Sequence, residues 1–193
     1  MSRIFRVQES NVLYHVINRG NAKQCLFFED WDYYQFICLL KKYKEKFGIK
    51  LYHYVLMPNH IHLLLEPTLP NSLSPFMQGL TLAYAQEFNQ KKKRIGHVWQ
   101  GRFKNIPITN DPYFLRCGQY IELNPVRANM VSDPIDYSWS SYATYTTGIP
   151  DPVIDLSPLY LALGATLEVR KIEYRKLAEQ QIKNQRNFSL IFQ

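Results

Sequence analysis

Long apolar runs and paired cysteines are the two features that this 193-residue sequence lacks. No stretch approaches the roughly 20 apolar residues of a membrane-spanning helix, and the N-terminal segment MSRIFRVQES contains no apolar signal region. The three cysteines, Cys25, Cys38 and Cys117, are far apart and form no CxxC pair. This pattern is typical of a reduced cytosolic protein and argues against a structural zinc cluster. Internal repeats and low-complexity segments are also missing, so we expect one main domain with a short appendage.

Positive charge, in contrast, is in excess. The chain has 23 Lys and Arg against 16 Asp and Glu, which gives a formal net charge of +7. Such an excess favours a polyanionic partner, with nucleic acid as the first candidate, although many basic proteins bind none. The 14 Tyr and 11 Phe are enough to build a core without disulfides.

The stretch of residues 57–66, MPNHIHLLLE, is the most informative part of the sequence. Its apolar run has the length of a strand and is entered through a Pro-Asn turn. On a strand, alternate residues share a face, so His60 and His62 point the same way with Cα atoms about 6–7 Å apart. Both imidazoles could then bind one cation. Two histidines bonded to neighbours on a polar face are the simpler alternative, and His-x-His alone does not decide between them.

The hydrophobic pattern predicts an order of strand, helix, strand, strand, helix, strand and helix over residues 11–124, and a further helix in the C-terminal tail. The strands are expected at residues 11–18, 49–57, 60–66 and 102–108, and the helices at 30–47, 72–90, 111–124 and 166–185. Within the second strand, Tyr52 and Tyr54 are expected on one face, with His53 and Val55 on the other. The order indicates an α+β fold of the ferredoxin-like split βαβ type (βαββαβ), with an antiparallel sheet and an additional C-terminal helix.

That additional helix is predicted to start at Asp111-Pro112 and to end before Pro125. Tyr120 and Asn124 are four residues apart in it, so they are neighbours one turn from each other. The last helix, at 166–185, could dock on the domain or reach toward a partner, and the sequence leaves both open.

Two basic segments are candidates for contact with nucleic acid. The second helix closes with four cations, Lys91, Lys92, Lys93 and Arg94, which either contact phosphates or lie in solvent at a helix C-terminus. Trp99, Arg102 and Lys104 follow, in a mixture of aromatic rings and cations that suits single-stranded nucleic acid. Trp99 and Phe103 could equally be core residues.

Three functions are compatible with these features. An RNA-recognition-type binder would display aromatic residues on its central strands, where this chain has histidines. A water-using metal hydrolase would need carboxylates near the histidines, and Glu66 is the only such residue nearby. A nuclease with a tyrosine nucleophile needs two histidines, a third ligand, a tyrosine and a basic surface. The sequence contains candidates for all four.

Four motifs, in this order, resemble the REP-associated tyrosine transposases, domesticated relatives of bacterial insertion-sequence transposases in the HUH (His-hydrophobe-His) class. The motifs are YHVINRGNAKQCLFFEDWDYY, MPNHIHLLLEP, HVWQGRFK and YIELNPVRANMV. The resemblance covers residues 11–142 and implies a catalytic domain at 1–147. It also implies that His60 and His62 bind the metal, that Asn124 completes the metal site, and that Tyr120 is the nucleophile. Residues 148–193, expected to form a linker and a helical tail, match nothing in the family.

The resemblance implies a metal-dependent endonuclease and strand transferase that cleaves single-stranded DNA near REP-type palindromic hairpins through a 5′-phosphotyrosine. The cofactor would be Mg²⁺ or Mn²⁺, and imidazole ligands favour Mn²⁺. Hairpin DNA would be the partner, without a membrane, in the cytoplasm at the nucleoid. The protein would act as a monomer or a homodimer. A non-catalytic ferredoxin-like protein that binds single-stranded nucleic acid is the alternative function.

Three further assignments concern single residues. Arg127, in the last motif, is counted among the DNA-binding residues. Tyr84 and Tyr113 are rival nucleophiles. Tyr84 lies on the core stripe of its helix, and Tyr113 has Cys117 where Tyr120 has Asn124. Tyr120 is therefore the preferred nucleophile.

Overall fold

The computed structural model describes residues 9–108 and 111–183 and contains a four-stranded antiparallel sheet. Its strands are β1 (Leu13–Arg19), β2 (Ile49–Met57), β3 (His60–Pro67) and β4 (Lys104–Ile108). They lie in the order β2-β3-β1-β4, with β1 paired to both β3 and β4 and with β2 and β3 forming a hairpin. This is the ferredoxin-like arrangement, so the predicted fold class is confirmed.

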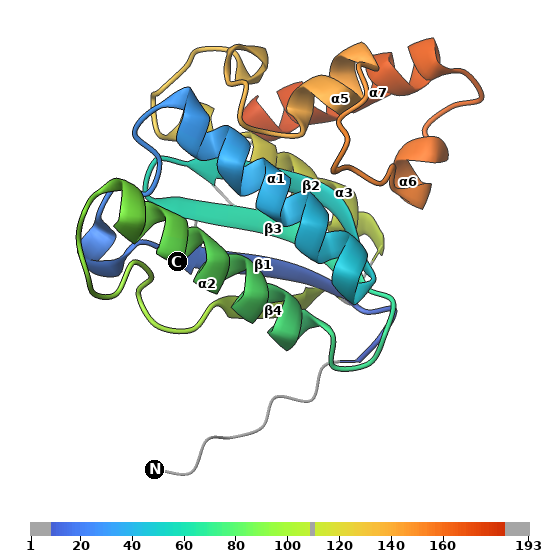
Figure 1. The fold of residues 1–193 in the computed structure, drawn as a ribbon. Helices are drawn as coiled ribbons and strands as arrows, with labels where there is room; N and C mark the ends of the chain where they lie inside the picture. Colours follow the sequence, from blue (N-terminus) through green and yellow to red (C-terminus); the bar gives the residue numbers. More distant parts are fainter. Residues whose placement is uncertain (1–8, 109–110, 184–193) are drawn as a thin grey trace.

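Two long helices, α1 (Asp30–Phe47) and α2 (Leu73–Lys91), cover one face of the sheet (Figure 1). Their apolar stripes meet the inward-facing residues of the strands in the larger core cluster of the protein. Phe36 and Leu40 of α1, Phe76 of α2 and Leu63 of β3 are fully buried in this cluster. A short 3₁₀ turn, η1 (Asn21–Lys23), follows β1.

Helix α3 (Asp111–Glu122) lies against the opposite face and is followed by the short α4 (Asn124–Arg127). Phe114, Gly118 and Ile121 face the sheet, and the helix ends before Pro125, as predicted. Helix α3 begins at Asp111, where its start was predicted, and residues 109–110 before it lie outside the described part of the chain.

The predicted alternation of side chains along β2 is wrong at one point. The pairing with β3 shifts register between Leu51 and His53, so Tyr52 is an extra residue in β2. Tyr52 therefore packs on the α3 side, whereas Tyr54 packs with Leu51 on the side of α1 and α2. A bulge of this kind turns two consecutive side chains to one face, and it brings His53 next to α3.

The C-terminal part of the described chain forms a small layer of its own beyond β2 (Figure 1). It contains η2 (Pro134–Asp136), α5 (Tyr142–Thr147), α6 (Pro158–Leu161) and α7 (Leu167–Lys183). Its core is aromatic and includes Tyr145, Tyr160 and Tyr174, all fully buried. Helix α7 packs against α3 and α5, so of the two arrangements that the sequence left open, the structure shows the docked one.

Among the residues that the structure describes, no helix combines the length and the apolar character required to cross a membrane.

Candidate active site

An open hollow of about 570 Å³ lies where β1, β3 and β4 meet the end of α3. Four predicted site residues line it together: His60, His62, Tyr120 and Asn124. The remaining lining residues are Ile17, Asn18, Arg19, Gln100, Arg102 and Lys104. Two of the predicted DNA-binding cations therefore stand beside the predicted active-site residues, and Arg19 adds a third cation that the sequence reasoning missed. Arg19 is the register partner of His60 across β1 and β3.

The two histidines of β3 stand side by side, with ring centroids 5.0 Å apart. Nδ1 of His60 lies 2.6 Å from Oδ1 of Asn59. Because an amide oxygen only accepts hydrogen bonds, Nδ1 of His60 must be the protonated nitrogen and donate. In the neutral ring this leaves the lone pair on Nε2.

A third histidine, His15 of β1, contacts His62. Nε2 of His15 lies 2.9 Å from Nδ1 of His62, and the two rings stack with centroids 5.1 Å apart. When Nδ1 of His62 donates in this bond, its Nε2 carries the lone pair, as in His60. Sequence reasoning missed His15. The available signal was its position between Tyr14 and Val16, which turns it to the face of the sheet opposite the larger core.

Burial keeps all three imidazoles uncharged at neutral pH. It lowers the pKa of His15 to about 4 and, together with the charge of Arg19, lowers the pKa of His60 to about 4. It lowers the pKa of His62 well below its ordinary value, and the neighbouring His15 and His60 add to this effect. Neutral imidazoles are the form that binds metals.

Asn124 presents its oxygen rather than its nitrogen. Its Nδ2 donates to the backbone carbonyls of Tyr120 and Ile121, both at 3.0 Å. Since these acceptors fix which end of the amide is the nitrogen, Oδ1 is the atom that the side chain can offer to a cation. Two imidazole nitrogens and one amide oxygen are thus available around the hollow.

Tyr120 comes from the same chain as the histidines. Its ring centroid lies 6.5 Å from that of His62 and 6.3 Å from that of His15. Burial raises the pKa of Tyr120, and the positive charge of Arg127 acts in the opposite direction. The guanidinium carbon of Arg127 lies 4.1 Å from the centroid of the Tyr120 ring, and its Nη1 donates to the Tyr120 carbonyl at 3.0 Å. Arg127, predicted to bind DNA, thus lies on the ring of the predicted nucleophile.

The cations at the end of α2 lie outside the residues that line this hollow. Lys91 forms ion pairs with Glu29 and, at 2.5 Å, with Asp32. Lys92 stacks its ammonium 3.6 Å from the ring centroid of Phe28, and Lys93 is exposed. Lys91 is therefore already paired within the protein.

Arg94 and Trp99 are also engaged in internal contacts. Nη1 of Arg94 donates to Oε1 of Gln24 at 2.7 Å. Nε1 of Trp99 donates to the carbonyl of Thr81 at 2.8 Å, and its ring packs against the larger core near Tyr84. For Trp99 the structure thus shows the core contacts that were the alternative to base stacking.

The rival candidates lie away from the hollow. Tyr84 is buried on the other face of the sheet and donates to the carbonyl of Leu26 at 2.7 Å. Tyr113 belongs to the first turn of α3, about two turns before Tyr120. Glu66, the carboxylate that a water-using hydrolase would need, accepts a hydrogen bond from the Tyr52 hydroxyl at 2.6 Å.

The comparisons with known proteins assign the chain to a family. The model of the IS200-like transposase family matches residues 8–124, a segment that contains His60, His62, Tyr120 and Asn124. The chain belongs to this family of transposases. The REP-associated tyrosine branch, expected from the four motifs, includes a solved structure that shares the fold of this chain.

Several solved structures are similar to the chain, including the following two. One is a REP-associated tyrosine transposase bound to a REP hairpin, with 18% identity, a TM-score of 0.63, and coverage of 81% of this chain and 93% of that chain. The other is a candidate transposase from Deinococcus radiodurans, with 20% identity, a TM-score of 0.44, and coverage of 63% of this chain and 96% of that chain. No curated protein matches the chain.

Proposed function

We propose that this transposase-family protein is a metal-dependent endonuclease and strand transferase for single-stranded DNA, with Tyr120 as its nucleophile. The observation that carries the proposal is the meeting of Tyr120, His60, His62 and Asn124 in one basic hollow of a single chain. Because one chain supplies all four residues, a monomer has a complete site.

The donor atoms fit a divalent cation. Nε2 of His60, Nε2 of His62 and Oδ1 of Asn124 would hold it. Within the described residues no three His, Cys, Asp or Glu side chains group as a metal site, so the amide oxygen is the third ligand that we assign. When bound, Mn²⁺ or Mg²⁺ would polarise the scissile phosphate, and the imidazoles favour Mn²⁺.

The phenol of Tyr120 attacks phosphorus and becomes bonded to the 5′-phosphate of the downstream fragment as a phosphotyrosine. The bond from phosphorus to the 3′-oxygen breaks, and the upstream fragment leaves with a 3′-hydroxyl that takes up the phenolic proton. A phenol with a pKa near 10 is a weak nucleophile at neutral pH. Burial raises the pKa of Tyr120 further, and the charge of Arg127 offsets part of this rise while its guanidinium packs on the ring. Attack by a 3′-hydroxyl on the phosphotyrosine reverses the step and joins DNA without external energy.

Arg19, Arg102 and Lys104 give the hollow a positive rim that suits the phosphates of a DNA strand. The similar transposase was solved with a REP hairpin. We assign the same class of substrate, single-stranded DNA with a REP-type hairpin, and a cytoplasmic location at the nucleoid.

The test is the variant Tyr120→Phe, which removes one oxygen and almost no volume. It should bind hairpin DNA and fold as the wild type does, but it should form no cleaved product and no covalent protein–DNA band on a denaturing gel. Tyr113→Phe, in the same helix, is the matched control and should keep both. Cleavage by Tyr120→Phe would point to a water-using hydrolase. Binding without cleavage by the wild type would point to the non-catalytic binding protein.

A further inference from the structure

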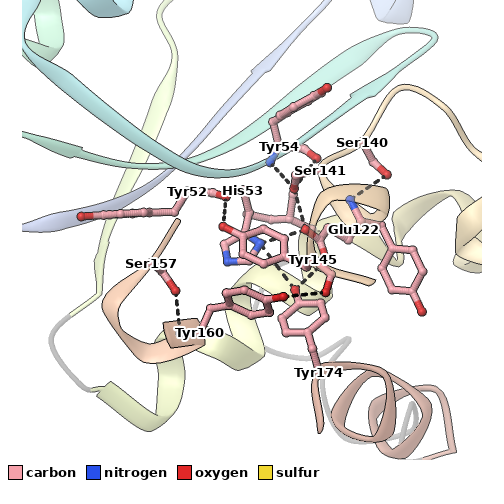
Figure 2. Close-up of polar contacts among 12 residues, drawn as sticks. Tyr52, His53, Tyr54, Glu122, Ser140, Ser141, Tyr145, Ser157, Tyr160 and Tyr174 are labelled. Atoms are coloured by element: carbon pink, nitrogen blue, oxygen red, sulfur yellow. Dashed lines mark hydrogen bonds and ion pairs between the residues drawn. The ribbon is translucent and has the colours of Figure 1, made fainter. Parts of the chain in front are cut away.

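A second polar cluster lies beside the active site and is closed to solvent. Its centre is the carboxylate of Glu122, on which three side chains converge (Figure 2). Ser141 donates its hydroxyl at 2.5 Å, Tyr174 donates its hydroxyl at 2.6 Å, and Nδ1 of His53 lies at 2.8 Å. All four residues have an exposed fraction of 0%.

The cluster is a structural joint rather than a second catalytic site. Ser, His and a carboxylate also occur together in hydrolases, where the serine donates to the imidazole. Here the Ser141 hydroxyl donates to Glu122 instead, and no atom of the cluster reaches solvent. Both carboxylate oxygens of Glu122 accept hydrogen bonds, whereas Nε2 of His53 has no hydrogen-bond partner among the described residues. Buried hydrogen bonds of this kind rigidify the elements that they join.

The elements joined are the ones that decide where Tyr120 lies. Glu122 is the last residue of α3, two residues after Tyr120, and His53 sits in β2 after the bulge. The His53 ring packs closely against the helix at Gly118, where an added Cβ would lie 2.6 Å from Nε2 of the imidazole. Tyr174 reaches the cluster from α7, and Ser141 immediately precedes α5.

We propose that the C-terminal segment, through Tyr174 and Glu122, is a positioning element for Tyr120. This proposal rests on the nucleophilic role of Tyr120 given above. The family match ends at residue 124, so Ser141 and Tyr174 hold the nucleophile helix from a part of the chain that the family match does not include. A displacement of about 1 Å at a reacting group can cost up to about 10²-fold in rate, which makes such a brace consequential.

The chain offers a matched control for this idea. Tyr160 belongs to the same aromatic cluster as Tyr174 and is equally buried. Its hydroxyl donates to the backbone carbonyl of Tyr145 at 3.0 Å, in place of the Glu122 carboxylate. Tyr174→Phe and Tyr160→Phe thus each remove one buried hydroxyl that donates a hydrogen bond, and only the first loosens Glu122.

The first readout needs no activity. Amide hydrogen exchange of the peptide containing residues 113–122 should be about tenfold faster in Tyr174→Phe than in the wild type, because one strong hydrogen bond to the helix end is lost. Tyr160→Phe should leave exchange in that peptide unchanged. Ser141→Ala, which removes another donor to Glu122, should act in the same direction as Tyr174→Phe and serves if that variant folds poorly.

The second readout is single-turnover formation of the DNA adduct with saturating hairpin DNA. For Tyr174→Phe we expect a rate constant about tenfold lower at saturating Mn²⁺, with an unchanged half-saturating Mn²⁺ concentration. Equal effects of Tyr174→Phe and Tyr160→Phe on both readouts would overturn the positioning role. A wild type without any adduct would overturn the proposed function, while the exchange result would still decide whether Tyr174 braces α3.

Discussion

Two histidine clusters lie on the same face of the sheet, and α3 contributes to both. In the open cluster, His60 and His62 have their Nδ1 atoms held by Asn59 and His15, and they line a hollow with Tyr120. In the closed cluster, His53 and Glu122 are sealed from solvent and bonded to each other. The residue type is the same, and the difference lies in whether a lone pair can reach a ligand. The open cluster has the properties of a reactive site, and the closed one those of a joint.

The largest loss of cleavage activity should follow from removing a histidine of the open cluster. His60→Ala should lower cleavage of hairpin DNA by about 10³-fold or more, because the nitrogen that we propose to bind the metal is lost. Binding of the DNA should be largely kept, since charge supplies it. The control is His97→Ala, which changes an exposed histidine outside the hollow. Full cleavage in EDTA would contradict a metal role for the open cluster.

The same kind of change in the closed cluster should act on stability. Glu122→Ala should lower the free energy of unfolding by about 3 kcal/mol or more, because it leaves buried donors without their acceptor. Glu87→Ala, at an exposed position of α2, should change it by less than about 0.5 kcal/mol. Urea unfolding followed by circular dichroism measures both. Equal free energies of unfolding for the two variants would mean that the closed cluster does not stabilise the fold.

His15 gives a sharper test, because it supports the open cluster without lining the hollow. His15→Leu places an apolar side chain in the buried position and removes the hydrogen bond to Nδ1 of His62. We expect the half-saturating Mn²⁺ concentration for cleavage to rise about 10- to 100-fold, as for other residues that orient a metal ligand. A titration with Mn²⁺ measures this concentration. An unchanged midpoint would contradict the role of His15 in orienting His62.

The smallest expected effect separates two cations. Arg102→Ala, in the hollow, should reduce the slope of log affinity for hairpin DNA against log salt by about 1. Lys91→Ala should leave the slope unchanged, because Lys91 is already paired with Glu29 and Asp32. Binding measured at several salt concentrations distinguishes them. A reduced slope for Lys91→Ala would show that DNA displaces its internal partners.

The fold and the centre of the site follow from local sequence patterns. The period of two places His60 and His62 together, and the helical period places Tyr120 next to Asn124. Contacts between residues far apart in sequence were not predictable in this way. Lys91 meets Glu29 across 62 positions, and His15 meets His62 across 47. The bulge at Tyr52 was missed for the same reason, because it depends on how β2 pairs with β3 and not on the composition of β2.

The central claim is that Tyr120 forms the covalent bond to DNA at the histidine site of its own chain. The most direct measurement is peptide mapping of the adduct formed by the wild-type protein with single-stranded hairpin DNA and Mn²⁺. We predict that mass spectrometry finds the nucleotide on the peptide containing Tyr120. A nucleotide on Tyr113 or Tyr84, or cleaved DNA with no adduct on any tyrosine, would contradict the account.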